Sequence, residues 1–202
     1  MRLVSFNIQY GFGTDGRYDL ARIASAVQDA DIVCLQEVER NWSRTNMDDQ
    51  PALIADLLPA HHWVYGPAFD MNASEVIAGR VVNRRRQFGT MILSRLPLQW
   101  SRLWPLPKRR MLDPLNTQNA ALEAVVARAG IKGYLTLASI SVPIAGMAAF
   151  TDELATVDTD RLTILVLSAH DLGVRLALSG ARGGSRAAMV VNLHARDERT
   201  GG

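Results

Sequence analysis

The feature that most constrains the fold is a short apolar run at residues 31–36, DIVCLQ, which is followed directly by Glu37. The run is short, bounded and β-branched at its start, which is typical of a strand buried on both faces. Another strand is expected at residues 2–7, RLVSFN, and it ends in Asn7. Between the two, apolar side chains recur at helical spacing over residues 20–27. The chain therefore opens with a strand, a loop, a helix and a buried strand.

The rest of the chain favours one α/β or α+β domain. Asp19 precedes the first helix as a cap, and a second helix is expected from Pro51 to Leu58. Further strands are expected, in chain order, at residues 62–65, 88–94, 98–104 and 121–127, with strand-like runs at 161–168 and 187–193. Strands with interspersed helices indicate a layered sandwich. Because 202 residues that are 48% apolar suffice for one core, we expect a single domain spanning residues 1–202.

The net charge identifies no function, and the cysteine content and the first residues indicate where the protein is located. The 22 basic and 20 acidic residues leave a formal charge of +2, which is too small an excess to identify a nucleic-acid-binding protein. The only cysteine, Cys34, lies inside the apolar run, so the sequence has no disulfide framework. The first residues, MRLVSFNIQYGFG, lack the features of a signal peptide. We therefore expect a reducing, cytoplasmic location.

One segment is apolar enough to raise the question of a membrane span. Residues 133–151 carry no charged side chain, and their length is close to the roughly 20 residues that cross a bilayer. The segment also contains Pro143, glycines and several hydroxyl side chains, and proline interrupts helices. We therefore expect no membrane span.

Glu37 and Asn7 are the residues best placed for chemistry. A carboxylate at the carboxyl end of a buried strand can hold a hard cation such as Mg²⁺, which prefers one or two carboxylates together with waters and phosphate oxygens. An amide on the neighbouring strand can hold a phosphate oxygen or orient an attacking group through its NH₂ donors. The pattern alone leaves a simpler alternative open, in which Glu37 is a surface acid and Asn7 forms a turn.

Three motifs resemble those of one known family. Residues 5–9, SFNIQ, and 31–38, DIVCLQEV, are similar to the opening strand and the metal-binding strand of the endonuclease/exonuclease/phosphatase family, and residues 88–94, FGTMILS, are similar to a later strand that usually reads FGNAILS. The motifs follow in the family's order within about the first 126 residues. The resemblance implies a two-sheet α/β sandwich with the site at one edge. It also implies that Glu37 binds Mg²⁺ or Mn²⁺ and that Asn7 contributes to the metal and phosphate site.

Two basic segments are candidates for contact with a phosphate. Arg84, Arg85 and Arg86 form a cluster, and guanidinium groups bind phosphate oxygens in bidentate fashion. A solvated loop is the alternative for these residues. The stretch at residues 40–44, RNWSR, follows Glu37 closely and could reach the leaving group.

The second half of the chain departs from the family pattern. The family mechanism uses an aspartate that activates water and a histidine that neutralises phosphate charge, and these come from motifs reading THL, GDxN and SDH that this chain lacks. Residues 134–139, YLTLAS, stand where THL is expected. His170 and Asp171 follow an apolar run and are the candidate substitutes, with an ordinary loop as the alternative. Because the composition also changes near residue 134, we expect the fold to be incomplete or divergent beyond it, through a divergent, truncated or frame-shifted tail.

These observations support a metal-dependent phosphoester hydrolase, meaning a phosphodiesterase, nuclease or phosphatase in which water attacks phosphorus with the help of the metal. The alternative is a catalytically inactive or truncated relative that binds a phosphorylated ligand, and a plain nucleic-acid-binding module is a third possibility. Nucleic acid, a lipid headgroup and a small phosphate ester present the same charged group, so the substrate stays open. No stable protein partner is expected.

Overall fold

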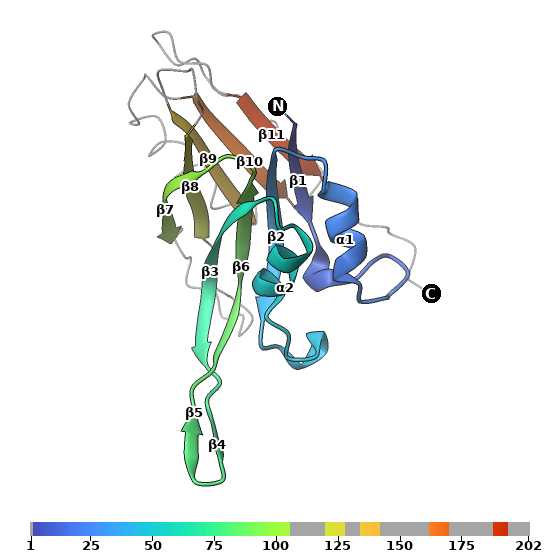
Figure 1. Ribbon diagram of the computed structural model, residues 1–202, viewed down its shortest axis with the longest axis vertical. Helices are drawn as coiled ribbons and strands as arrows, with labels where there is room; N and C mark the ends of the chain where they lie inside the picture. Colours follow the sequence, from blue (N-terminus) through green and yellow to red (C-terminus); the bar gives the residue numbers. More distant parts are fainter. Residues whose placement is uncertain (1, 106–119, 128–133, 142–161, 170–187, 194–202) are drawn as a thin grey trace.

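The protein is an α/β sandwich of two β-sheets, with two helices on the outer face of the first sheet (Figure 1). The structure, a computed structural model, describes residues 2–105, 120–127, 134–141, 162–169 and 188–193. The first sheet has the strand order β1-β2-β6-β3, and the second has the order β11-β10-β9-β8-β7. This arrangement confirms the fold class expected from the sequence.

The elements of the first layer are, in chain order, β1 (Leu3–Asn7), the short turn η1 (Gln9–Gly11), α1 (Leu20–Val27), β2 (Ile32–Arg40), η2 (Ser43–Thr45), α2 (Gln50–Leu57), β3 (His62–Asn72) and β6 (Arg85–Ser94). A small hairpin of β4 (Glu75–Ile77) and β5 (Arg80–Val82) lies between β3 and β6 in the sequence. The second sheet contains β7 (Leu98–Pro105), β8 (Ala120–Ala127), β9 (Tyr134–Ser141), β10 (Leu162–Ala169) and β11 (Ala188–Leu193).

Strand β2 is buried on both faces, which explains its continuous apolar sequence. Val33 and Leu35 pack towards the two helices, in a core shared with α1 and α2. Ile32 and Cys34 point the other way and pack between the two sheets, against Leu122 of the second sheet and its neighbours. The second sheet therefore covers the face of the first sheet that points away from the two helices.

Both helices begin at an aspartate cap, and the sequence predicted the first of these caps. The Asp19 carboxylate accepts a hydrogen bond from the backbone N–H of Arg22, as predicted. The Asp49 carboxylate does the same for Ala52 at the start of α2, where Pro51 occupies the first turn. Each cap satisfies a backbone N–H in the first turn of its helix.

The tail beyond residue 134 adds strands to the second sheet. β9 pairs in parallel with β10, and β10 pairs in parallel with β11, whereas β7, β8 and β9 are antiparallel. The strands expected at residues 161–168 and 187–193 match β10 and β11 to within a residue. In the part of the chain that is described, no helix has the length and apolarity to cross a bilayer. Of the apolar segment 133–151, residues 134–141 form β9, and the others lie outside the described residues.

Strands β3 and β6 are longer than predicted and continue beyond the sheet as a two-stranded ribbon (Figure 1). The prediction ended the first of these strands at Tyr65, but β3 reaches Asn72 and pairs with Arg85 there. Hairpin β4–β5 was not predicted and forms the tip of the ribbon. Arg85 and Arg86 therefore lie in a strand, where the sequence had offered a solvated loop as the alternative.

Candidate functional site

Asn7 and Glu37 lie side by side at one end of the first sheet. Strands β1 and β2 are parallel, and Asn7 is paired with Gln36, the residue before Glu37. The Asn7 side-chain NH₂ donates a hydrogen bond of 2.9 Å to Oε1 of Glu37. Both side chains are nearly buried, with 2% and 5% of their surfaces exposed. The predicted proximity of these two groups is therefore confirmed.

A β-bulge sets the direction of the Glu37 side chain. In the pairing with β6, Gln36 lies opposite Thr90 and Val38 lies opposite Gly89, so Glu37 is the extra residue. Its φ of 60° lies in the left-handed region that residues with a side chain rarely adopt. After the bulge, Val38 rejoins the core on the helix side, and the Glu37 carboxylate lies beside Asn7, the last residue of β1. The bulge therefore removes Glu37 from the regular alternation of the strand.

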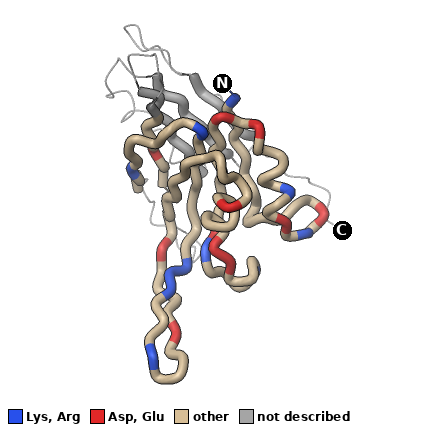
Figure 2. Tube along the Cα trace, viewed as in Figure 1, with Lys and Arg blue, Asp and Glu red and all other residues tan. Residues whose placement is uncertain are grey.

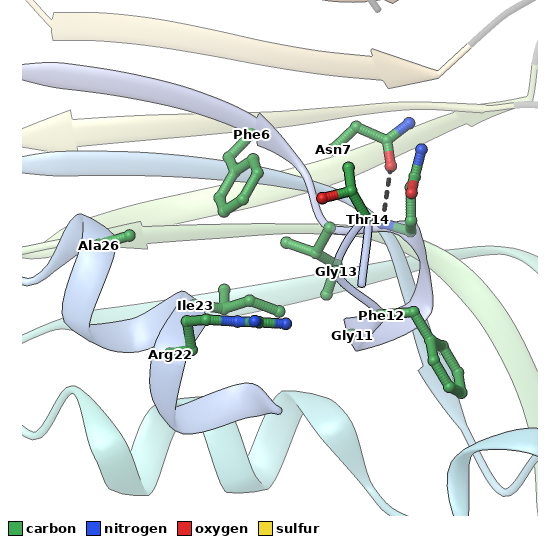
Figure 3. Close-up of a pocket in the computed structure, with 11 residues that line it drawn as sticks. Phe6, Asn7, Gly11, Phe12, Gly13, Thr14, Arg22, Ile23 and Ala26 are labelled. Atoms are coloured by element: carbon green, nitrogen blue, oxygen red, sulfur yellow. Dashed lines mark hydrogen bonds between the residues drawn. The ribbon is translucent and has the colours of Figure 1, made fainter. Parts of the chain in front are cut away.

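The Asn7 amide is oriented by two hydrogen bonds. Its Oδ1 accepts a bond of 3.0 Å from the backbone N–H of Gln9 (Figure 3), while its NH₂ faces Glu37. Reversing the amide would place oxygen against a carboxylate oxygen and NH₂ against an N–H donor, so the two bonds define one orientation. This geometry favours Asn7 as the residue that orients Glu37.

Tyr10 and Arg44 both interact electrostatically with the Glu37 carboxylate. Burial raises the pKa of the Tyr10 phenol, and the charge of Glu37 and a hydrogen bond with it raise that pKa further. The guanidinium carbon of Arg44 is 3.8 Å from the centre of the Tyr10 ring, a cation–π contact. A neutral phenol and a cation therefore stand close to Glu37.

A second buried acid, Glu39, anchors Arg44. Glu39 is fully buried, and both of its carboxylate oxygens accept hydrogen bonds from Arg44, with Thr45 as a further donor. Burial raises the pKa of Glu39, although Arg44 opposes that rise. The side chain of Gln50 links the parts, because it accepts from the Glu39 N–H at 2.8 Å and donates to the Tyr10 carbonyl at 2.6 Å. Residues from β2, η1, η2 and α2 thus form one polar network.

Two residues of the predicted arginine cluster are already paired with acids on the ribbon. Arg84 NH1 is 3.6 Å from a carboxylate oxygen of Glu75, and Arg85 Nε donates to Asp70 at 2.8 Å. The Arg85 hydrogen bond lowers the pKa of Asp70. These two guanidinium groups lie on the ribbon formed by β3 and β6.

Arg86 points towards the loop that follows β2. Its Nε donates to the Asn41 carbonyl at 3.2 Å, and its guanidinium lies 5.7 Å from the centre of the Trp42 ring. Asn41 Nδ2 in turn donates to the Arg85 carbonyl, and Trp42 Nε1 donates to the Gln87 carbonyl. The loop after β2 is therefore hydrogen-bonded to the start of β6.

The other predicted residues fall into two groups. Arg40, in the stretch expected near the leaving group, forms an ion pair with Asp49 at 2.9 Å and lies over the Tyr65 ring, so its observed contacts stabilise the fold. His170 and Asp171 lie outside the described residues.

The side chains at this sheet end fit a sparsely coordinated cation. Among the residues that the structure describes, no three His, Cys, Asp or Glu side chains gather as a metal cage. Mg²⁺ does not need such a cage, because it commonly binds one or two carboxylates and completes its shell with waters and substrate oxygens. Glu37 could supply a hard oxygen ligand of this kind, and the hydrogen bond from Asn7 restricts the orientation of its carboxylate.

A pocket of about 410 Å³ adjoins Asn7 between β1, the loop after η1 and α1 (Figure 3). Phe6 and Ile23 form part of its apolar wall, and Thr14 and Arg22 are among its polar lining residues. Arg22 is held by a two-point contact with Asp15. The pocket therefore meets the Asn7–Glu37 pair through Asn7.

Sequence reasoning did not identify three residues of the network: Tyr10, Glu39 and Gln50. The strand expected at residues 31–36 ended before Glu39, so nothing in the pattern indicated that this acid is buried; the structure extends β2 to Arg40 and buries it. No signal marks Tyr10 either, whose φ of 60° arises from the irregular turn η1.

Comparisons with known proteins indicate the same family as the sequence motifs. A family model described as "Endonuclease/Exonuclease/phosphatase family" matches residues 4–185, which extends well past the 126 residues that carry the recognised motifs. The search of curated proteins found no match.

Several solved structures share the fold. The chain is similar to an endonuclease/exonuclease/phosphatase from Beutenbergia cavernae, with 24% identity and a TM-score of 0.59 over 81% of this chain and 46% of that one. It is also similar to a family protein from Leptotrichia buccalis (11% identity, TM-score 0.56, 82% of this chain and 66% of that one). A third is a humanized D. rerio TDP2 (16% identity, TM-score 0.53, 82% and 64%). This chain thus spans between 46% and 66% of their lengths.

Proposed function

Because this chain belongs to the endonuclease/exonuclease/phosphatase family, we propose that it is a divalent-metal-dependent phosphoester hydrolase. The observation that supports this most strongly is the hydrogen bond between Asn7 and the buried Glu37 at a β-bulge. Bulges frequently redirect side chains at functional sites. An acid held in this way at the end of a sheet is suited to bind Mg²⁺ or Mn²⁺.

Each residue of the site has a distinct role in this proposal. Glu37 would hold the cation, and Asn7 would keep the carboxylate in one orientation and contribute to the metal and phosphate site. When bound, the cation supplies positive charge that polarises the phosphoryl oxygen and favours attack by water. Arg44, which is hydrogen-bonded to Glu39 and packs over Tyr10, would add a guanidinium group near the site.

The remaining predicted residues complete the proposal. Arg84, Arg85 and Arg86 would attract the anionic substrate electrostatically. His170 and Asp171 would accept and donate protons during the reaction. The substrate is a phosphate ester of a nucleic acid, a lipid headgroup or a small molecule, and the single buried Cys34 supports a cytoplasmic location.

The test is hydrolysis of bis(p-nitrophenyl) phosphate with Mg²⁺ by the wild type and by Glu37→Gln. We expect the substitution to lower kcat/KM roughly a hundredfold or more, because the metal's charge stabilisation in the transition state is worth several kcal/mol. Asp56→Asn is the matched control, since it removes one negative charge from an exposed position of α2. Equal activity of Glu37→Gln and the wild type would contradict the proposal.

A second outcome identifies the alternative function. The chain lacks the family's THL, GDxN and SDH motifs, which favours a relative that binds a phosphorylated ligand without hydrolysing it. Calorimetric binding of the same ester by the wild type, with no turnover and with loss of binding in Glu37→Gln, would support that function in place of hydrolysis.

A further inference from the structure

The ribbon formed by β3 and β6 ends in an unusually apolar tip. The three most exposed large apolar side chains of the described residues are Val76, Val81 and Ile77, with 72%, 66% and 50% of their surfaces exposed. They lie on hairpin β4–β5, which projects beyond both sheets (Figure 1). Val76 and Val81 are direct cross-strand partners, so their side chains share one face. Apolar side chains grouped in this way on a projection indicate an interaction surface.

The hairpin is preformed. Ala78 and Gly79 connect its strands with φ angles of 48° and 76°, and two consecutive positive values are typical of the tight turn that suits a β-hairpin. At its base, the Ser74 hydroxyl donates to the Asn72 side chain at 2.6 Å and accepts from the Arg84 N–H at 3.1 Å. The tip therefore needs little ordering when it binds.

Basic side chains lie at the turn of the hairpin and at its base. Residues 70–86 contain four arginines (Arg80, Arg84, Arg85 and Arg86) and two acids (Asp70 and Glu75), which gives a formal charge of +2 for the segment. Figure 2 shows the arginines along the ribbon and at its tip. Arg80 is the cross-strand partner of Ile77 next to the turn, and this pair lies on the face opposite to Val76 and Val81. An apolar end with basic side chains at its turn and base is complementary to a surface that is apolar inside and anionic outside.

We propose that hairpin β4–β5 docks the protein onto an anionic lipid surface. Val76, Ile77 and Val81 enter the boundary between headgroups and acyl chains, and Arg80 contacts lipid phosphates. Each arginine near an anionic bilayer adds about fivefold to binding, which corresponds to roughly 1 kcal/mol. The contact is peripheral and requires no spanning helix.

The composition of the segment favours lipid over other occupants. Residues 71–86 contain no aromatic side chain on which a base could stack. A second copy of the same tip would bring two positively charged segments together, and like charges repel.

The experiment measures flotation of the full chain with phosphatidylcholine vesicles that contain 30% phosphatidylserine, without metal or substrate. We expect the double variant Val76→Thr, Val81→Thr to bind these vesicles at least tenfold more weakly than the wild type. Threonine matches valine in shape and in its preference for strands, so the hairpin is retained. The matched control is Leu53→Gln, Leu57→Gln, which removes two exposed leucines from α2 and should bind like the wild type.

A labelled variant reports the docking directly. Val81→Cys carrying an environment-sensitive fluorophore should shift its emission to the blue on these vesicles, whereas Asp56→Cys should not. The native Cys34 is fully buried, and burial raises the pKa of its thiol to about 12, so it does not compete for the label. Arg80→Gln should weaken binding about fivefold.

Three results would overturn the proposal. The first is absence of wild-type flotation, and the second is equal flotation of the wild type and the threonine variant. In the third, neither protein binds vesicles, and the wild type instead retains a nucleic acid or forms a dimer, whereas the threonine variant does neither. Because the assay contains no metal and no turnover, its failure is distinct from failure of the proposed hydrolysis.

Discussion

At the scale of single residues, Glu37 has two features that lower the stability of the folded state and that a purely structural position would avoid. Its carboxylate is nearly buried, and its φ of 60° lies in the left-handed region. That conformation costs about 1 kcal/mol or more for a residue with a side chain. The regular pairing of Gln36 and Val38 on either side holds it in place. Strain of this kind, imposed by ordered neighbours, is common where a side chain has a function.

The strain makes a prediction about stability. We expect Glu37→Gly to be more stable than Glu37→Ala by about 1 kcal/mol, because only glycine adopts a positive φ without cost. Both variants lose the same carboxylate, so their difference isolates the backbone. The free energy of unfolding in urea measures it.

An ordinary strand position provides the control. Ser101 is exposed in β7 and does not have a positive φ, so Ser101→Ala should be more stable than Ser101→Gly there. If Glu37→Ala also proves the more stable of its pair, the bulge is not strained as described.

Sequence reasoning predicted part of this site. Asn7 and Glu37 were identifiable because Asn7 ends the first apolar strand and Glu37 directly follows the apolar run 31–36 on its parallel neighbour. The sequence placed Glu37 at the carboxyl end of its strand, whereas β2 continues past it to Arg40. The bulge was not predictable, because a single extra residue leaves no mark in an apolar run. Tyr10 and Glu39 depend on that local irregularity and on the turn η1, so they became visible only in the structure.

At the scale of elements, the ribbon of β3 and β6 carries the basic segment and was underestimated from the sequence. The apolar alternation stops where the ribbon leaves the core, so the pattern ended these strands early. Cross-strand charge pairing replaces core packing there, as shown by the bond from Arg85 to Asp70.

This ion pair predicts a pH dependence of stability. The hydrogen bond from Arg85 lowers the pKa of Asp70 from its ordinary value of 3.8. A carboxyl whose pKa is lower in the folded state stabilises the protein above the ordinary value, and that contribution is lost as the pH falls through the lowered pKa. The melting temperature of the wild type should therefore exceed that of Asp70→Asn near about pH 6, and the difference should shrink as the pH falls below 3.8 and through the lowered pKa.

Thermal melts of both proteins across this range measure the effect. Arg85→Gln should remove the same pH-dependent difference, because it deletes the donor that lowers the pKa. A gap between the wild type and Asp70→Asn that stays constant with pH would show that the pair does not contribute as charges.

At the scale of the whole molecule, the doubly buried β2 organises both layers. Its alternate side chains form one core with the helices and another with the second sheet. The apolar sequence of β2 therefore predicted a strand covered on both faces. The order of strands in the second sheet was not predictable, because pairings such as β9 with β10 join segments distant in the sequence without a local signal.

The central claim is that Asn7 and Glu37 together form a site for a divalent cation, and titration with Mn²⁺ followed by electron paramagnetic resonance tests it without any need for turnover. The account predicts that the wild type binds Mn²⁺, that Glu37→Gln weakens binding at least tenfold, and that Asp56→Asn binds like the wild type. Equal Mn²⁺ binding by the wild type and Glu37→Gln would contradict it.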